Sequence, residues 1–299
     1  MPSQTDVTKR HDFVLLFDVT DGNPNGDPDA GNLPRVDPET MQGLVTDVAI
    51  KRKVRDFVDL ANQVDDRYKA AGYKIYVQHR EYLTAQRERV FNERAPGKKN
   101  VPVADARSWM CQEFYDVRMF GAVMSMKERN AGQVRGPVQL KFARSIDPIS
   151  YQDVTIVGPA QRSGDTARAA DGEEQAEVQG TMGRKAVVPY GLYRTHGFFN
   201  PHFAKDTGAT DTDLELLWHA LQTTWDYDHS AARGEMHCRG LYVFSHESSL
   251  GNAPSHVLFD RVVVTRNAGV EAPRKFTDYT VAVEDTPLPS GVSFKALVG

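Results

Sequence analysis

An apolar run near the start of the sequence places the strongest constraint on the fold. Residues Phe13–Val19 read FVLLFDV, and a short apolar run of this kind is typical of a strand buried on both faces of a sheet. The next stretch, Thr20–Glu39, is rich in Gly, Pro, Asn and Asp, a composition that excludes helix and strand alike. We therefore expect a central strand that ends in a long, turn-rich loop.

A helix is expected next, from about Met41 to Ala70, with Gly72 as its stop signal. Its apolar residues recur at spacings of four, seven, eight and eleven, which places them on one helical face. These residues are Ile50, Val54, Phe57, Val58 and Ala61. This face is expected to pack on the sheet.

The same helix carries a dense group of cations, because Ile50–Arg55 reads IKRKVR. At roughly 100° per residue, Lys51, Arg52 and Arg55 fall within a wedge of about 100° beside the apolar stripe. Lys53 points to the other side. Three cations on a rigid helix can line a phosphate backbone, and such contacts fix the register of a strand without reading its sequence.

The alternative interpretation of this helix is a solvated surface laced with ion pairs. Residues four apart on a helix are neighbours, so acid–base pairs at this spacing form readily. The helix offers three of them, namely Asp47–Lys51, Arg52–Asp56 and Arg55–Asp59. Spacing alone leaves both interpretations open.

The remaining elements predict an α+β protein with insertions. A charged segment, Arg80–Asn100, is expected to form a protruding helical arm or a loop. Helices are expected over Pro102–Asp116 and from about Thr212, where Thr212 and Glu215 have the capping-box spacing. The second helix has an apolar stripe made of Leu214, Leu217, Trp218, Leu221 and Trp225. Strands are expected at Tyr73–Gln78, Val134–Ile146, Ile149–Val157, Ala186–Tyr193, Gly240–Phe244, Val257–Val264 and Tyr279–Val283.

The order of these elements is compatible with a ferredoxin-like, RRM-type core. Gly158–Arg184 is polar and Gly-rich and lies between two apolar stretches, a pattern that predicts a long hairpin projecting from the body. A chain of 299 residues with 40% hydrophobic and 25% charged residues suits one elaborated domain. Two distant cysteines make no disulfide framework.

The charge is distributed unevenly. The net charge of −4 argues against a generic basic nucleic-acid binder. However, Gln78–Asn100 is mostly basic where it is charged, as is the first helix, whereas Asp147–Glu177 is acidic. A basic groove on an acidic body suits a protein that grips one strand. We expect no membrane segment and no signal peptide, and hence a cytoplasmic protein.

The motifs for catalysis and metal binding are weak. Asp18, Asp21 and Asp27 are candidates for a metal-dependent nuclease. Asp21-x-Asn23-x-Asn25-Gly26 matches half of a calcium loop, but the terminal glutamate is missing because the twelfth position is Asn32. The histidines show no zinc spacing. We expect no cofactor and no metal, and we keep a nuclease and a calcium-binding module as alternatives.

Apolar residues at two kinds of position are candidates for contact with bases. Arg239–Phe244 (RGLYVF) partly matches an RNA-stacking strand, although Leu241 stands where an aromatic is expected, and core packing is favoured. Phe120 and Met182 each precede a glycine and are candidate wedges against bases. Ordinary packing is the alternative for both.

Five sequence blocks together resemble a known family. They are FDVTDGNPNGDP (Phe17–Pro28), GLVTDVAIKRKVRD (Gly43–Asp56), DVRMFG (Asp116–Gly121), GPVQLKFARSIDPI (Gly136–Ile149) and VVPYGLYRTHGFFNP (Val187–Pro201). In this order they resemble the backbone subunit of the subtype I-C CRISPR surveillance complex (Cascade), a member of the RAMP superfamily. The resemblance covers nearly the whole chain.

The resemblance implies an RRM-like palm with inserted finger and thumb segments. The palm would comprise residues 1–79, 101–146 and 187–299, the finger 80–100, and the thumb hairpin 147–186. Copies would stack head-to-tail along a guide RNA (crRNA), each thumb folding over the RNA bound by its neighbour, which makes the interface heterologous. In this subtype other subunits cut nucleic acid, so no catalytic residue is expected. In related type III backbone subunits a loop Asp cuts RNA, which keeps Asp21 and Asp27 as alternatives.

The resemblance also implies which residues bind RNA. The basic helix would become a phosphate cradle, aided by the adjacent loop, the MFG block, the base of the thumb and a wedge residue. The implied RNA-binding residues are Asn23, Asn25, Arg35, Lys51, Arg52, Arg55, Phe120, Arg135, Lys141, Arg144 and Met182. The implied partners are crRNA, target DNA through the guide, further copies of the chain and other Cascade subunits. Base pairing would read the sequence, while the protein would hold the backbone.

Overall fold

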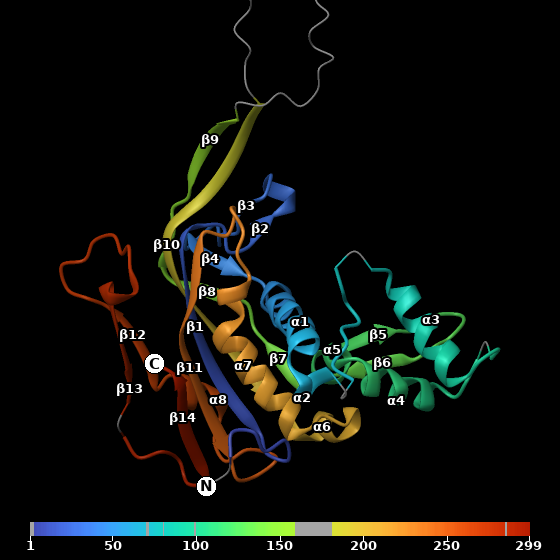
Figure 1. Ribbon diagram of the computed structural model, residues 1–299. Coiled ribbons are helices and arrows are strands. Elements are labelled where there is room, and N and C mark those ends of the chain that lie inside the picture. Colours follow the sequence, from blue (N-terminus) through green and yellow to red (C-terminus); the bar gives the residue numbers. More distant parts are fainter. Residues whose placement is uncertain (1–2, 70–71, 80, 99, 159–180, 285) are drawn as a thin grey trace, which may run out of the picture.

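The computed structural model describes residues 3–69, 72–79, 81–98, 100–158, 181–284 and 286–299. The predicted first strand is present as β1 (His11–Gly22), which lies inside an eight-stranded sheet (Figure 1). Its neighbours are β10 (Thr181–Phe199) and β11 (Glu235–His246), both antiparallel to it. Among the described helices, none is long and apolar enough to cross a membrane.

The central sheet is antiparallel along its main path. The strand order is β14-β11-β1-β10-β8-β4, and β7 and β9 also pair with β10. All of these pairings are antiparallel. The remaining strands of the sheet are β4 (Gln42–Val45), β7 (Val138–Leu140), β8 (Ala143–Pro148), β9 (Gln152–Gly158) and β14 (Val292–Val298).

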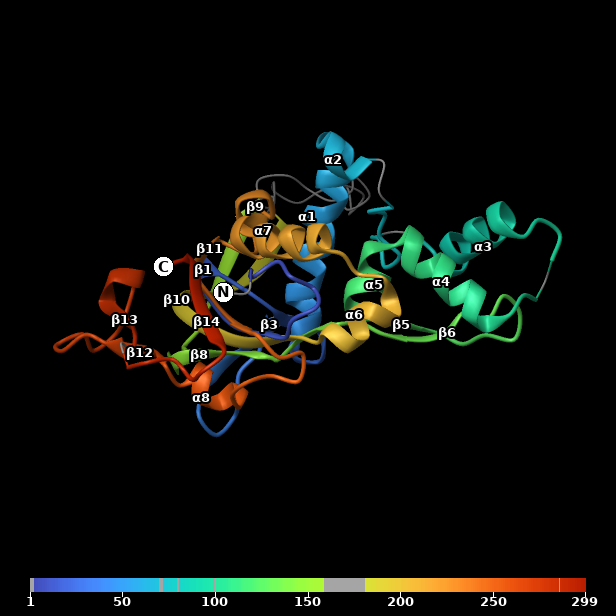
Figure 2. The same cartoon turned by 90° about the horizontal axis from the view of Figure 1, so that it is seen from below.

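Alternate residues of β1 serve two hydrophobic cores. Phe13, Leu15 and Phe17 pack with α1 (Asp47–Val64) and α7 (Asp211–Tyr227) on one face. Val14 and Leu16 pack on the other face with residues of three smaller elements (Figure 2). These elements are α8 (Ser255–Phe259), β12 (Val262–Arg266) and β13 (Tyr279–Val283). Both faces of the sheet are therefore covered, as the apolar run predicts.

The basic helix begins later than predicted. Residues 42–45 pair with β8 as strand β4, and Thr46 then caps α1 by accepting a hydrogen bond from the Ala49 N–H at 3.2 Å. The predicted apolar stripe is confirmed, because all five of its residues are buried. A one-turn helix, α2 (Asp66–Lys69), follows α1.

The second core helix is also confirmed, but its cap was assigned to the wrong residue. Thr210 caps α7, and its own N–H donates to Asp213 Oδ2 at 2.8 Å in a reciprocal capping box. Thr212 lies inside the helix instead. The five apolar residues predicted to form its stripe are all buried.

A helical arm extends to one side of the sheet (Figures 1 and 2). We define the arm as α3 (Leu83–Arg94), α4 (Val103–Glu113), β5 (Gly121–Met124) and β6 (Gly132–Arg135). It has a hydrophobic core of its own, which includes residues from 76 to 134. The arm thus draws on more of the chain than the segment 80–100 that was predicted to protrude.

The predicted long hairpin is present. Strands β9 and β10 pair from Gln152 opposite Val187 to Gly158 opposite Thr181, and they project from the body (Figure 1). Residues 159–180 of the predicted thumb lie outside the described residues. The division into palm, finger and thumb stays a prediction.

Several predicted strands differ in the structure. Tyr73–Gln78 forms only an isolated bridge from Lys74 to Phe114, with Tyr73 and Ile75 in the main core and Tyr76 in the core of the arm. Val134–Ile146 is split among β6, β7 and β8. Val257–Val264 contains the end of helix α8 before β12 begins. The turn-rich loop Thr20–Glu39 contains the end of β1, then β2 (Gly26–Asp27), the 3₁₀ helix η1 (Pro28–Ala30) and β3 (Leu33–Pro34).

The remaining short elements connect these parts. They are α5 (Tyr115–Phe120), which links the arm to the sheet, α6 (Pro201–Thr207), and the 3₁₀ helix η3 (Phe276–Asp278). Strand β14 was not predicted, since its residues Val292–Val298 show no clean alternation. It lies at the edge of the sheet beside β11.

Candidate nucleic-acid interface

Two of the predicted cations on α1 gather around one aromatic ring. Lys51 Nζ lies 5.8 Å from the centre of the Phe120 ring, and the Arg55 guanidinium carbon lies 5.3 Å from it. Such distances allow cation–π attraction. The ring itself is only 7% exposed, so Phe120 supports the two cations from below. The structure therefore brings together three residues that were predicted from separate parts of the sequence.

Each of these cations is also held by a carboxylate. Lys51 donates to Asp47 Oδ2 at 2.9 Å, and Arg52 Nε donates to Asp56 Oδ2 at 3.2 Å, so two of the i,i+4 pairs foreseen in the sequence form. The prediction of the third pair, Arg55–Asp59, is wrong. Arg55 Nε donates instead to Asp116 Oδ2 on α5, at 2.8 Å. Paired cations remain able to bind phosphate where part of the cation is accessible.

The accessibility of the α1 cations differs. The Arg52 side chain is 44% exposed, whereas Lys51 and Arg55 are 13% and 11% exposed. Lys53 lies on the other side, as expected from the helical angle, and contacts Asp228 in a nearly buried pair. Burial lowers the pKa of Lys53, and the contact with Asp228 offsets this lowering only in part. Lys53 is therefore a structural cation.

Two glycines allow the end of α5, which carries Phe120, to pack closely against the chain that leaves β6. Gly121 has φ +82°, and a Cβ there would lie 2.4 Å from the Val134 carbonyl oxygen. A Cβ on Gly136 would lie 2.3 Å from the Phe120 carbonyl carbon. Only residues without a side chain permit so close an approach. The MFG block and the start of the GPVQLK block are thus one packed unit.

The residues of the turn-rich loop brace the start of α1. Asn25 Oδ1 accepts a hydrogen bond from the Thr46 N–H at 2.9 Å, and Asn23 Nδ2 donates to the Asn32 carbonyl oxygen at 2.8 Å. Arg35 lies 3.4 Å from Asp27 Oδ2. These bonds position the loop beside α1, while the side-chain oxygen of Asn23 is buried without a recorded partner. Whether Asn23, Asn25 or Arg35 contacts RNA stays a prediction.

The loop carboxylates do not gather into a metal site. Asp18 is buried, and its Oδ2 accepts from Arg239 Nε at 2.8 Å and from the Tyr190 hydroxyl at 3.0 Å. Asp27 accepts from the Asp29 N–H, and Asp21 is exposed in a left-handed backbone conformation with φ +49°. In the part of the chain that the structure describes, no group of three His, Cys, Asp or Glu side chains could hold a metal ion.

The predicted residues at the base of the hairpin are dispersed. Arg144 pairs with Asp37 at 2.7 Å, and Lys141 is exposed beyond the end of β7. The Arg135 guanidinium lies 4.3 Å from the centre of the Phe203 ring on α6. The side chain of Met182 lies outside the described residues. The structure thus unites only some of the predicted site.

Arg135 lines a cleft between the arm and the start of α7. The cleft has a volume of about 1210 Å³ and is bordered by five basic and two acidic residues. Arg107, Arg135 and Lys205 are exposed, and no ion pair is recorded for them within the described ranges. The charged lining residues are Arg67, Arg107, Arg118, Arg135, Lys205, Asp206 and Asp213.

A buried ion pair holds the wall of this cleft. Arg118 on α5 donates to both carboxylate oxygens of Asp213 on α7, at 2.9 and 2.6 Å. Burial lowers the pKa of Arg118, but the hydrogen bond and charge of Asp213 outweigh this and raise it. No local pattern predicted this pair, because its two residues lie 95 positions apart. Asp116 was missed for the same reason, although it opens the DVRMFG block.

The RGLYVF strand is buried on both sides, as predicted. Leu241 and Val243 face the helices, while Tyr242 and Phe244 face the covering elements α8 and β12. An RNA-stacking strand must leave its aromatic residues open to bases. This strand is therefore part of the core.

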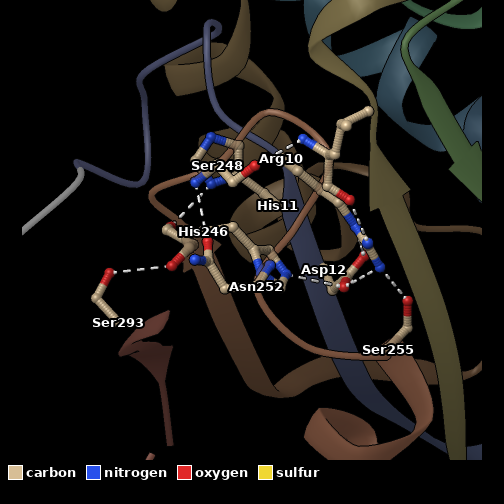
Figure 3. Close-up of polar contacts among 10 residues, drawn as sticks. Arg10, His11, Asp12, His246, Ser248, Asn252, Ser255 and Ser293 are labelled. Atoms are coloured by element: carbon tan, nitrogen blue, oxygen red, sulfur yellow. Dashed lines mark hydrogen bonds and ion pairs between the residues drawn. The ribbon is translucent and has the colours of Figure 1, made fainter. Parts of the chain in front are cut away.

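A buried histidine network lies at the start of β1 (Figure 3). His246 Nε2 lies 3.1 Å from Asp12 Oδ2, and its Nδ1 accepts from the Asn252 N–H at 2.8 Å. Arg10 also donates to Asp12 Oδ2, at 2.8 Å. Both ring nitrogens of His246 are thus engaged, which leaves none to activate a nucleophile. This Asp–His pair joins β1 to β11 and has the geometry of a structural contact.

Together these observations define a class: a mixed α/β protein with a central antiparallel sheet, a lateral helical arm and a carboxylate-braced cationic helix. The chain belongs to the CRISPR-associated protein Cas7 family, whose family model matches residues 9–284. The family part of the resemblance seen in the sequence is confirmed.

The individual proteins that the chain resembles share only a modest part of its sequence. The chain is 26% identical over 244 residues to a CRISPR-associated protein Cas7 of Haloferax volcanii, a match that covers 72% of this chain and 65% of that relative. It thus spans about 65% of the relative's length. A solved chain of a CRISPR RNA-guided surveillance complex, pre-nicking, is similar with a TM-score of 0.49 and 14% identity, covering 79% of this chain and 78% of that one. A chain of a type III-B Cmr-beta complex bound to cognate target RNA has a TM-score of 0.40 and 10% identity over 79% and 61%.

Proposed function

We propose that this chain is the crRNA-binding backbone subunit of a type I-C CRISPR surveillance complex. Copies would assemble head-to-tail along the guide RNA, together with other Cascade subunits, and present the RNA for pairing with target DNA in antiviral defence. The chain would act in the cytoplasm without catalysing a step. The observation that carries the proposal is the convergence of Lys51 and Arg55 on Phe120, because it creates an ordered cationic surface on a rigid helix.

The topology supports an RRM-like palm. The four strands β11-β1-β10-β8 lie side by side in this order. Helix α1 follows β1, helix α7 lies between β10 and β11, and both pack on the same face. This is the arrangement of a β-α-β-β-α-β unit. In the proposal the helical arm acts as the finger, and the β9–β10 hairpin acts as the thumb.

The chemistry of the α1 surface suits a sugar–phosphate backbone. Lys and Arg contacts to phosphates supply affinity that does not depend on sequence and that falls as salt rises. A guide-carrying protein needs this mode of binding, because it must accept many spacers and leave their bases free. No aromatic stacking platform is required for it, which fits the burial of the RGLYVF strand.

The second candidate function is a metal-dependent ribonuclease that uses Asp21 or Asp27. Divalent-metal catalysis needs convergent carboxylates, and Asp18 is instead engaged by Arg239 and Tyr190. Asp27 is engaged by Arg35 and the Asp29 N–H. These contacts favour the binding role over the nuclease.

The proposal is tested with purified protein and a single-stranded RNA of fixed length. The wild type is expected to bind RNA with little sequence preference and to leave it intact in magnesium. Replacing Lys51, Arg52 and Arg55 with Ala is expected to weaken binding about 100-fold, because each lost phosphate contact removes roughly 1 kcal/mol. Affinity is measured by fluorescence anisotropy, and integrity of the RNA on a denaturing gel.

The matched control removes the same charge elsewhere. Lys127, Arg274 and Lys295 are exposed, and their replacement with Ala is expected to change RNA affinity less than about threefold. Equal losses in the two triple variants would rule out α1 as the binding surface. Magnesium-dependent fragments that disappear in Asp21→Ala would replace the proposal with the nuclease.

A further inference from the structure

The carboxylate of Asp116 connects three segments of the chain. It is 1% exposed. Its Oδ1 accepts from the Tyr76 N–H at 2.7 Å, and its Oδ2 accepts from the Val77 N–H at 3.1 Å and from Arg55 Nε at 2.8 Å. A buried carboxylate with three donors is well compensated. Asp116 on α5 thus connects α1 to the segment that enters the arm.

Arg55 is oriented by two contacts, a hydrogen bond at Nε and an aromatic ring close to the guanidinium. Asp116 engages Nε, and the plane of the group lies near the Phe120 ring. For Nη1 and Nη2, no hydrogen bond is recorded within the described residues. Some arginines have a buried Nε without a partner, namely Arg35, Arg87, Arg89 and Arg261. Nη1 and Nη2 of Arg55 are not among these buried atoms. The two terminal nitrogens of Arg55 are therefore not fully buried, and the side chain as a whole is 11% exposed.

We propose that Asp116 is a positioning residue, which holds Arg55 by its Nε edge so that Nη1 and Nη2 bind one RNA phosphate as a two-pronged fork. This inference rests on the proposed function and names the phosphate-binding group within it. Guanidinium recognises phosphate best through two parallel N–H donors held in one plane. A fixed side chain also loses less conformational entropy on binding than a free one.

Asp116 has a second effect that opposes the first. Its negative charge lies beside Arg55 and weakens the attraction of the site for any anion. If Asp116 only neutralised Arg55, its removal would strengthen RNA binding. If Asp116 positions Arg55, its removal weakens binding although the protein gains one positive charge. The two roles thus differ in the sign of the effect.

The chain offers a matched control for this sign. Asp56 is the exposed partner of Arg52 on the same helix, and it makes no recorded contact with the arm within the described residues. Asp56→Asn removes the same charge as Asp116→Asn. It is expected to leave RNA binding unchanged or to tighten it up to about threefold, since surface pairs contribute little order.

The test measures RNA affinity by anisotropy at several salt concentrations for Asp116→Asn, Asp56→Asn and Arg55→Lys. Asp116→Asn is expected to bind about tenfold more weakly than the wild type. Arg55→Lys keeps the charge but has no fork, and is expected to lose about fivefold with the salt slope nearly unchanged. In the Asp116→Asn background, Arg55→Lys is expected to cost less than twofold, because the fork is already unpositioned.

Each outcome decides the proposal. Tighter or equal binding by Asp116→Asn would overturn it, as would an Arg55→Lys variant that binds like the wild type. Circular dichroism and thermal unfolding show whether Asp116→Asn folds, and if it does not, Arg55→Lys alone decides. A wild type that binds no RNA would instead remove the proposed function, which keeps the two failures distinct.

Discussion

The cationic face of α1 carries three predicted cations and the cleft beside the arm is lined by five, and the two regions hold their cations differently. On α1, Lys51, Arg52 and Arg55 each contact a carboxylate, and two of them also flank a buried ring. In the cleft, Arg107 and Lys205 are exposed without a recorded ion pair in the described part of the chain, and Arg135 rests on Phe203.

The difference shows that net positive charge is a poor guide to a binding surface. An exposed lysine or arginine loses considerable side-chain entropy when it is immobilised on a ligand. Two of the α1 cations, Lys51 and Arg55, have already been ordered by Asp47, Asp116 and the Phe120 ring. We therefore expect α1 to bind RNA more tightly than the cleft, although the cleft cations are the more exposed.

The largest effect is expected at the wall of the cleft. Arg118→Ala leaves Asp213 buried without its charged partner, and is expected to lower the free energy of unfolding by about 3–5 kcal/mol. Urea denaturation measures this value. Arg107→Ala, on the same cleft, should change it by less than about 0.5 kcal/mol. A loss below about 1 kcal/mol for Arg118→Ala would show that the ion pair does not hold the wall.

The next effect separates the two cationic surfaces. Replacing Arg107, Arg135 and Lys205 with Ala is expected to weaken RNA binding less than about fivefold, against about 100-fold for the α1 triple variant. The salt slope of the α1 variant should fall by about two, because roughly 0.7 is lost per phosphate contact on a single strand. A greater loss for the cleft variant would reverse the comparison.

A change in pH should weaken the fold and leave the α1 surface intact. Burial lowers the pKa of His11, and burial together with Arg194 lowers that of His196 to about 4. The unfolded chain therefore takes up protons below about pH 6.5 while the folded chain does not, so stability is full above that pH and is lost as pH falls towards 4.

The expected loss between pH 7.5 and 5 is about 1–3 kcal/mol, reduced because the His196 ring is only partly buried. Thermal unfolding at several pH values measures it, and His196→Gln should flatten the dependence. RNA affinity over the same range should change less than about threefold, since lysine and arginine stay charged. Rising stability on acidification would contradict the assignment.

The smallest effect is expected for Arg52→Ala. Its pair with Asp56 is exposed on both sides, so the free energy of unfolding should change by less than about 0.5 kcal/mol. RNA affinity should fall only about twofold, because one contact without a positioning ring is lost. Equal losses for Arg52→Ala and Arg55→Lys would remove the distinction between ordered and mobile cations.

Local patterns in the sequence predicted the core well. The stripes of α1 and α7 and the run in β1 are periodic over many residues, and burial of such faces needs no knowledge of distant partners. The predicted boundaries of the elements were wrong where tertiary contacts override the local sequence pattern. Residues 42–45 pair with β8 and do not extend α1, and Tyr73–Gln78 is divided between the main core and the core of the arm.

The candidate site was predictable only as a list of cations. Helical spacing correctly separated Lys53 from Lys51 and Arg55. It suggested Asp59 as the partner of Arg55, because the true partner Asp116 lies 61 positions away. The resemblance placed Arg135 at the base of the thumb, whereas its guanidinium lies against the Phe203 ring and lines the cleft beside the arm. Long-range contacts of this kind leave no local periodicity to read.

The most direct test is a cryo-EM structure of the protein assembled on single-stranded RNA. The strand should run along α1, with a phosphate oxygen about 2.7–3.2 Å from both Arg55 Nη1 and Nη2, while Nε stays on Asp116. A strand bound in the cleft against Arg107 and Lys205, with the α1 cations facing solvent, would contradict the central claim.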